Sequence, residues 1–150
     1  NGEIMKLIVL LLALNTIAVS VSFADGEGHE HGDKTELHKI MENWEKEWKF
    51  IVKNSRKQAK NAITLKAIDR LLVIIDSAKP EKPAMTDDLS VNKRAGFFKS
   101  YQERIEKFKA GLEKVKTLLI SDKNSEARLI LKVLNSQKKA GHGDFKKEEE

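Results

Sequence analysis

The sequence contains no cysteine and only two prolines, Pro80 and Pro83, among its 150 residues. Disulfide bonds are therefore excluded, so stability has to come from a packed core, a bound cofactor or both. The scarcity of proline, together with only eight glycines, leaves long stretches free to form helices. Lys, Glu, Leu, Ile and Ala are abundant in the remainder, which is typical of a single all-α domain.

The charged residues form no long block of one sign. The formal net charge is +5, from 28 Lys and Arg against 23 Asp and Glu, and the two signs are interleaved along the chain. This pattern is typical of a solvated helix surface and argues against nucleic-acid binding. The sequence also lacks a nucleophile–base pair, a carboxylate dyad in a special setting and a glycine-rich phosphate loop. We therefore expect a protein that is not an enzyme.

A short apolar run near the N-terminus predicts export. Met5 and Lys6 precede the almost entirely apolar residues 7–21, and small residues then occupy the first and third places of Ser22-Phe23-Ala24. These features predict a signal peptide over residues 1–24, with Met5 as initiator and cleavage after Ala24. An uncleaved anchor is the alternative, although the run is short for a membrane span. The mature protein is expected to be periplasmic, with no membrane segment.

Two charged or polar tails are predicted to flank the folded domain, which extends over residues 35–146. Residues 25–34 carry His29 and His31 among glycines and acidic residues. This composition cannot build a core and predicts a flexible, solubilising tail, with weak binding of zinc or copper(II) as the alternative. Residues 147–150 form a charged C-terminal tail.

Apolar residues recur at spacings of three and four in four segments, which is the period of an amphipathic helix. The first helix is predicted from about Thr35 to Arg56 and the second from about Ala62 to Ala78. The third starts at Thr86 or near Val91 and ends before the turn at 121–124, and the fourth follows, capped by Ser125 and reaching Phe145. Val73 is expected to widen the buried stripe of the second helix. The third helix has the most regular stripe, made of Phe98, Tyr101, Ile105, Phe108, Leu112, Val115 and Leu119.

Two short turns and one longer connection predict an antiparallel up-down-up-down four-helix bundle. In this topology the start of the first helix and the end of the fourth lie at the same end. Met41 is in the second turn of the first helix, and His142 follows Leu134 by eight residues, which places it on the core-facing side of the fourth. A thioether and an imidazole are thus expected to face each other, a pair that suits haem iron or copper(I).

Each of these two residues also has an ordinary interpretation. A methionine on an apolar stripe is usually core filler, and a histidine near a helix end is usually solvated. Gly141 and Gly143 flank the histidine, and each costs a helix interior about 1 kcal/mol relative to alanine. The two glycines indicate a frayed end, or else Ala140 and Gly141 clear space for a bulky planar group beside the imidazole. The return of the apolar stripe at Phe145 favours the second interpretation.

The segment from Gln137 to Lys146 reads Q-K-K-A-G-H-G-D-F-K. It resembles the C-terminal haem motif of the soluble cytochrome b562 family and of its relatives, the cytochromes c′. In the covalent relatives this motif is C-x-x-C-H-x-x-F/Y-R/K, and here Lys138 and Gly141 occupy the two cysteine positions. The resemblance extends over nearly the whole chain from Thr35, including the apolar positions three, seven and ten residues after Met41. It implies one non-covalent b-type haem, because no cysteine is present for thioether attachment.

The resemblance also implies roles for individual residues. Met41 and His142 would be the axial ligands, and Lys138 or Lys146 would pair with a haem propionate. The expected pocket residues are Trp44, Tyr101, Ile105 and Phe108.

Three side chains leave alternatives open. Trp44 and Trp48 are larger than the residues that the family often has at these positions, so the indoles could fill the pocket, stack on the haem or simply pack in the core. His38, three residues before Met41, is a possible rival ligand or a group at the haem edge.

The function implied is electron transfer, because an iron with both axial sites filled is poorly suited to binding a substrate. The lysine-rich surface suits acidic redox partner proteins, and a closed bundle is expected to be a monomer. The alternative is a haem-free periplasmic helical bundle that binds metal ions or protein partners.

Overall fold

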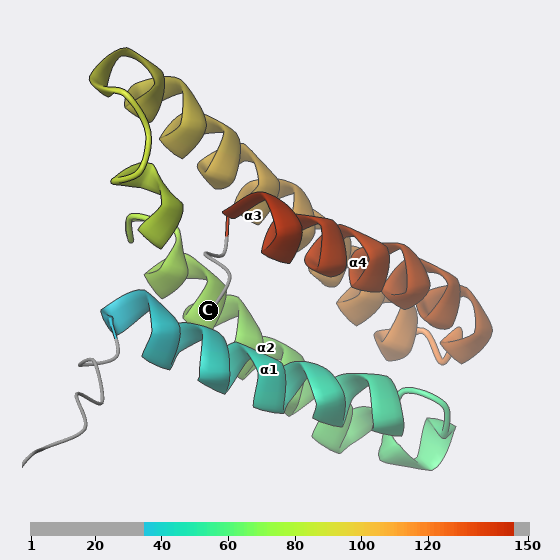
Figure 1. Cartoon of the computed structure of the whole chain (residues 1–150). Helices are drawn as coiled ribbons and strands as arrows, with labels where there is room; N and C mark the ends of the chain where they lie inside the picture. Colours follow the sequence, from blue (N-terminus) through green and yellow to red (C-terminus); the bar gives the residue numbers. More distant parts are fainter. Residues whose placement is uncertain (1–34, 146–150) are drawn as a thin grey trace, which may run out of the picture. The chain divides into compact units, whose positions relative to one another are not determined.

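The computed structural model describes residues 35–145. Four helices make up this part of the chain: α1 (Glu36–Asn54), α2 (Asn61–Ala78), α3 (Val91–Ile120) and α4 (Asn124–Phe145) (Figure 1). Two 3₁₀ turns, Gln58–Lys60 and Ala84–Thr86, lie in the connections that flank α2. The predicted signal peptide, the tail with His29 and His31, Lys146 and residues 147–150 lie outside the described residues.

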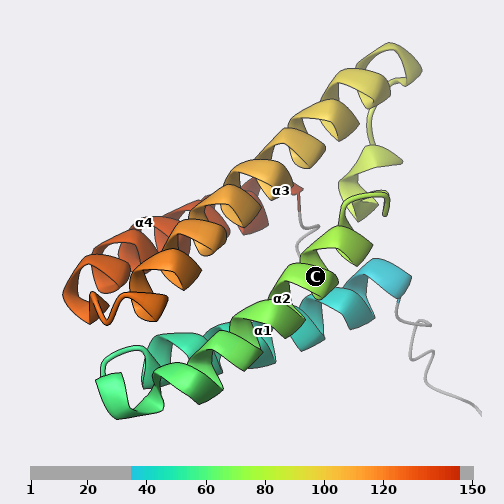
Figure 2. The ribbon, with the colours of Figure 1, turned by 180° about the vertical axis from the view of Figure 1, so that it is seen from behind.

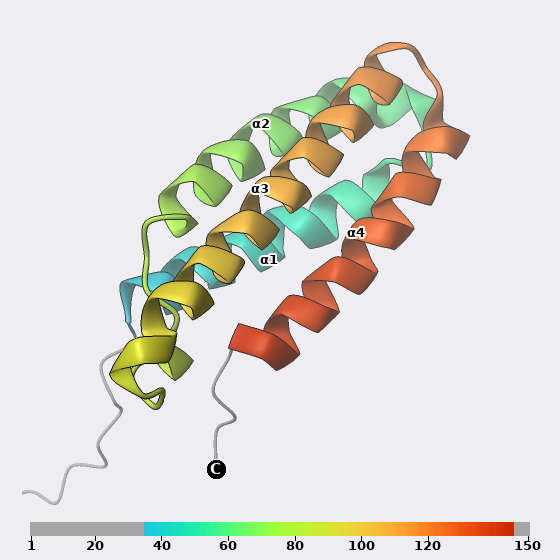
Figure 3. The same ribbon diagram turned by 90° about the horizontal axis from the view of Figure 1, so that it is seen from above.

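The helices pack in the order of the sequence, α1 against α2, α2 against α3 and α3 against α4. Successive helices run in opposite directions, as the two opposite views in Figures 1 and 2 show. The prediction of an all-α, antiparallel up-down-up-down four-helix bundle is therefore confirmed. Figure 3 shows the first turn of α1 and the last turn of α4 at the same end of this bundle.

The stripes predicted from the sequence supply the core. On α3, Leu112, Val115 and Leu119 are at most 1% exposed, as the three-and-four spacing predicts. Phe108 lies between two indoles, with its ring centroid 4.9 Å from that of Trp44 and 5.4 Å from that of Trp48. Aromatic pairs at such separations add to the stabilisation that burial provides. The core thus joins α1 to α3 through these rings.

The predicted helix ends are right at some places and wrong at others. Thr35 caps α1, because its hydroxyl accepts a hydrogen bond from the backbone N–H of His38. α3 begins at Val91 rather than at Thr86, which ends a 3₁₀ turn and is buried. α4 begins at Asn124, so Ser125 lies inside the helix and the predicted cap was wrong.

One predicted core residue is exposed. Val73 was expected to widen the buried stripe of α2, but it is 67% exposed. Its neighbours on the packed face, Leu71 and Ile75, are fully buried. The apolar arc of α2 is wider than the surface that α1 and α3 cover, so the outermost member of the arc stays in solvent.

Two asparagine side chains, one buried and one half-buried, join the helices at the end of the bundle opposite to the first turn of α1 and the last turn of α4. The side-chain amide of Asn61, at the start of α2, donates to the carbonyl of Leu119 and to Asp122 Oδ1. The amide of Asn124, at the start of α4, donates to the carbonyl of Ser55 and to Asn61 Oδ1. These hydrogen bonds connect the turn after α1 with the turn between α3 and α4.

Within residues 35–145, none of the helices is both long enough and apolar enough to cross a membrane.

Candidate cofactor site

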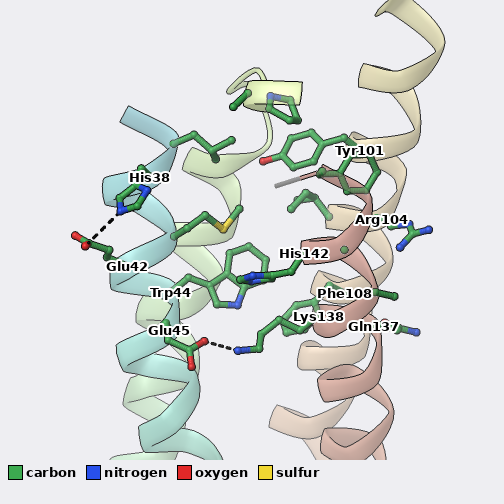
Figure 4. Close-up of a pocket in the computed structure, with 18 of the residues that line it drawn as sticks. His38, Glu42, Trp44, Glu45, Tyr101, Arg104, Phe108, Gln137, Lys138 and His142 are labelled. Atoms are coloured by element: carbon green, nitrogen blue, oxygen red, sulfur yellow. Dashed lines mark hydrogen bonds and ion pairs between the residues drawn. The ribbon is translucent and has the colours of Figure 1, made fainter. Parts of the chain in front are cut away.

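A cavity of about 980 Å³ opens between α1, α3 and α4 at the end where Met41 and His142 lie. This volume is at the upper end of the range typical of small-molecule and cofactor sites, roughly 300–1,000 Å³. The first turns of α1, the middle of α3, the last turns of α4 and the Pro83-Ala84 segment form its walls. Figure 4 shows these walls, with side chains from α1 and α4 pointing into the space between them.

The cavity brings together the predicted site residues that the structure describes. They come from three helices and are Met41, Trp44, Tyr101, Ile105, Phe108, Lys138 and His142. Lys146 lies outside the described residues. The roles of these side chains toward a cofactor stay predictions, because proximity to one cavity does not by itself make a residue a ligand.

Two polar contacts between α1 and α4 define the register of these antiparallel helices. The indole N–H of Trp48 donates to Asn135 Oδ1 over 3.4 Å. One turn away, the ammonium group of Lys138 forms an ion pair with Glu45. Three residues back along α1, from Trp48 to Glu45, thus match three residues forward along α4, from Asn135 to Lys138. The two helices keep one register over this distance.

The same register continues to the predicted ligands. Four residues further back from Glu45 is Met41, and four residues further on from Lys138 is His142. At a rise of about 1.5 Å per residue, both side chains lie about 6 Å beyond the ion pair and at one level of the bundle. Met41 from α1 and His142 from α4 both line the cavity.

A family model described as cytochrome b562 matches residues 36–146 of the sequence. The chain belongs to the cytochrome b562 family. Members of this family are haem-binding electron carriers and not enzymes. No curated protein and no solved structure gave a match to the chain.

The donor set around the cavity fits the haem of a cytochrome b562. A haem iron needs only two ligands from the protein, and thioether with imidazole is an established axial pair. Within residues 35–145, no group of three or more His, Cys, Asp or Glu side chains could hold a metal ion.

The glycines beside His142 differ in their relation to the cavity. Gly141 lines it, and a Cβ atom added there would meet no atom within 4 Å. Gly143 also has open space around it but does not line the cavity. Ala140 and Gly141, where clearance for a planar group is predicted, both line the cavity, and that clearance stays a prediction. Neither glycine has a positive φ angle.

The two tryptophans leave the cavity open. Trp48 packs on Phe108, lies outside the cavity wall and is 3% exposed, so it is an ordinary core residue. Trp44 lines the cavity while also packing on Phe108. Its indole nitrogen is buried and has no hydrogen-bond partner among the described residues. Burying such a donor without a partner costs free energy, which indicates that an acceptor belongs in or beside the cavity.

Tyr101 contributes an apolar wall rather than a titrating group. Its hydroxyl donates to the carbonyl of Ala78 over 2.7 Å, and the side chain is 3% exposed. Burial, together with the charge of Glu81, raises the pKa of this phenol well above its usual range. The hydroxyl group therefore stays protonated, and its hydrogen bond holds the end of α2 against α3.

Sequence reasoning missed Glu45 as part of the site. Burial raises the pKa of its carboxyl group, but the hydrogen bond and charge of Lys138, with help from Lys49, outweigh burial and lower the pKa below its ordinary value. The signal was present in the sequence, because Glu45 follows Met41 by four residues and Lys138 precedes His142 by four. Lys138, which was expected to meet a propionate, thus has a protein partner.

Arg104 was also missed. Its guanidinium group forms an ion pair with Asp144 at 2.5 Å and lies over the ring of Phe145, 5.4 Å from the centroid. It lines the cavity from α3 and connects α3 to the last turn of α4. Its position one residue before Ile105, at the edge of the apolar stripe, was the available signal.

Proposed function

We propose that this cytochrome b562 family member binds one non-covalent b-type haem, with Met41 and His142 as the axial ligands, and carries single electrons. The observation that carries the proposal is the shared register, which brings the thioether of α1 and the imidazole of α4 to one level of a cofactor-sized cavity. The absence of cysteine from the sequence is consistent with a haem held without thioether bonds.

The bound haem would supply one-electron chemistry at its iron. The protein would supply the ligands and the apolar surroundings of the haem. Met41 from α1 and His142 from α4 would hold the iron between them, and this would leave no position for a substrate. Trp44, Ile105 and Phe108 provide an apolar surround that excludes water. The thioether ligand stabilises the reduced state and so raises the reduction potential.

The expected surroundings of the protein belong to the same proposal. The apolar N-terminal segment supports export to the periplasm. The net charge of +5 supports weak, salt-sensitive docking to acidic redox proteins. A bundle whose apolar stripes are mostly covered supports a monomer.

Haem titration of the refolded chain tests the ligand assignment. The wild type should bind one haem per chain, and sharp low-spin bands should appear on reduction. His142→Ala should abolish these bands, and Met41→Ala should give a high-spin spectrum with a lower reduction potential. Met85→Ala, which changes a methionine outside the cavity, and His38→Ala should bind haem as the wild type does.

Two results would reject the assignment. Low-spin bands that persist in the double variant Met41→Ala, His142→Ala would show that other residues ligate the iron, and a loss in His38→Ala would identify the rival. A wild-type chain that binds no haem would favour the haem-free bundle instead.

A further inference from the structure

The edge between α1 and α4 differs from the other edges of the bundle. The sequential pairs α1 and α2, α2 and α3, and α3 and α4 pack closely, whereas α1 and α4 are not among the closely packed pairs. The cavity lies along this edge. The distance between Met41 and His142 therefore depends on whatever holds these two helices at their separation.

The Glu45–Lys138 ion pair crosses this edge one turn below the predicted ligands (Figure 4). The side chain of Lys138 is 17% exposed and that of Glu45 is 35% exposed. Partly buried ion pairs are screened less by salt than exposed ones. Lys49, on α1, also contacts Glu45 at 3.4 Å but stays on the same helix, so it cannot hold α4 in place.

We propose that Glu45 and Lys138 are a positioning pair, which sets the separation of α1 and α4 and thereby presents Met41 and His142 to the haem. The proposal rests on the proposed function for the identity of the cofactor. Neither residue touches the iron in this account. Each acts through the helix that carries a ligand, one turn away, as groups behind a metal ligand commonly do.

A competing role for Lys138 is direct contact with a carboxylate of the cofactor. The two roles make opposite predictions for Glu45→Gln. If Lys138 positions α4 through Glu45, removing the carboxylate weakens haem binding. If Lys138 instead serves the cofactor, removing Glu45 releases the ammonium group, and haem binding stays the same or becomes tighter.

The first experiment compares haem affinity in the full chain. Glu45→Gln and Lys138→Met should each raise the Kd for haem about tenfold, the low end of the range for residues behind a metal ligand. The charge-swapped variant Glu45→Lys, Lys138→Glu should recover most of this loss, although its new lysine lies near Lys49. An unchanged or lower Kd in Glu45→Gln, or no recovery in the swapped variant, would overturn the proposal.

A matched control uses an ion pair away from the cavity. Lys116 on α3 and Asp69 on α2 are 2.6 Å apart and lie outside the cavity wall. Asp69→Asn and Lys116→Met should leave the Kd for haem within about twofold of the wild type, since this pair joins helices that already pack closely. An equal loss in these controls would mean that any interhelical ion pair has the same effect, which would also overturn the proposal.

The second experiment needs no haem. Because the chain has no cysteine, spin labels can be attached at Asn43→Cys on α1 and Lys139→Cys on α4. The distance distribution between the labels should be narrow with the native pair and broader or longer in Glu45→Gln and Lys138→Met. An unchanged distribution would overturn the positioning role. If the wild type bound no haem, the proposed function would fail, while this measurement would still judge the ion pair.

Discussion

At the end of the bundle where α2 and α4 begin, the side-chain amides of Asn61 and Asn124 join the turns to each other and to α3. At the opposite end, a cavity of about 980 Å³ opens between α1, α3 and α4. The first end is held by hydrogen bonds whose donors and acceptors are satisfied within the protein. The second end contains a buried donor, Trp44 Nε1, without a partner among the described residues.

This difference indicates that one end of the bundle stabilises the fold and the other end binds the cofactor. The amide-joined end and the core next to it stabilise the fold, because a network of satisfied hydrogen bonds makes that end rigid. Side chains at the cavity end make fewer packing contacts than those in the core, and a bound group would have to supply the missing contacts. Substitutions far from the cavity should therefore lower the free energy of unfolding more than substitutions beside it. Substitutions beside the cavity should weaken cofactor binding more.

The largest effect expected from this comparison separates Trp48 from Met41. Trp48→Ala removes an indole that is 3% exposed from the packed core and should lower the free energy of unfolding by about 3–5 kcal/mol. Met41→Ala changes a half-buried side chain beside existing space and should cost about 1 kcal/mol or less. Urea unfolding of the haem-free chain measures both. Similar losses of unfolding free energy in the two variants would contradict the proposed difference between the packed core and the cavity end.

A smaller effect is expected at the amides. Asn61→Ala removes an amide that donates to the carbonyl of Leu119, to Asp122 Oδ1 and to Asn124 Oδ1, and it should cost about 1–3 kcal/mol. Asn135→Ala removes the acceptor of the long 3.4 Å contact with the Trp48 indole N–H. Both side chains line an open surface hollow where water can replace that acceptor, so the variant should cost about half as much or less. Thermal unfolding of the haem-free variants decides the order. A larger loss of stability in Asn135→Ala than in Asn61→Ala would contradict the conclusion that the amide-joined end is the more rigid one.

The smallest effect concerns pH at the cavity end. The pKa of Glu45 is lower in the folded chain than its ordinary value of 4.5, so its ion pair stabilises the fold above about pH 4.5. That contribution is lost as the pH falls through the lowered pKa. Because the carboxyl group is partly exposed, the contribution should be below about 1 kcal/mol.

The measurement for this prediction is a difference between two chains. The wild type should unfold at a higher urea concentration than Glu45→Gln at pH 6, and the gap should close as the pH is lowered to 3. The histidines are the same in both chains, so their titration cancels in the difference. A gap that stays constant down to pH 3 would contradict the prediction.

The sequence carried much of the fold and part of the site. The three-and-four spacing located four helices, and their short connections predicted the topology that brings Met41 and His142 to one end. Sequence reasoning missed Glu45 as the partner of Lys138. The apolar pattern of one helix shows on which face of that helix a residue lies, but it does not show which residue of another helix lies opposite. The expectation that Lys138 or Lys146 meets a haem propionate stays a prediction, and the contact of Lys138 with Glu45 emerged only from the register of α1 and α4.

What the sequence determined by itself is local and periodic. It specifies which residues form helices, which face of each helix is apolar and, through the resemblance to cytochrome b562, which two side chains are candidate ligands. Only the tertiary structure decided that Val73 is exposed, that α3 begins at Val91, and that a cavity remains beside Trp44. The physical reason is that burial and open space depend on how far apart neighbouring helices lie, and that distance results from the packing of all four helices together.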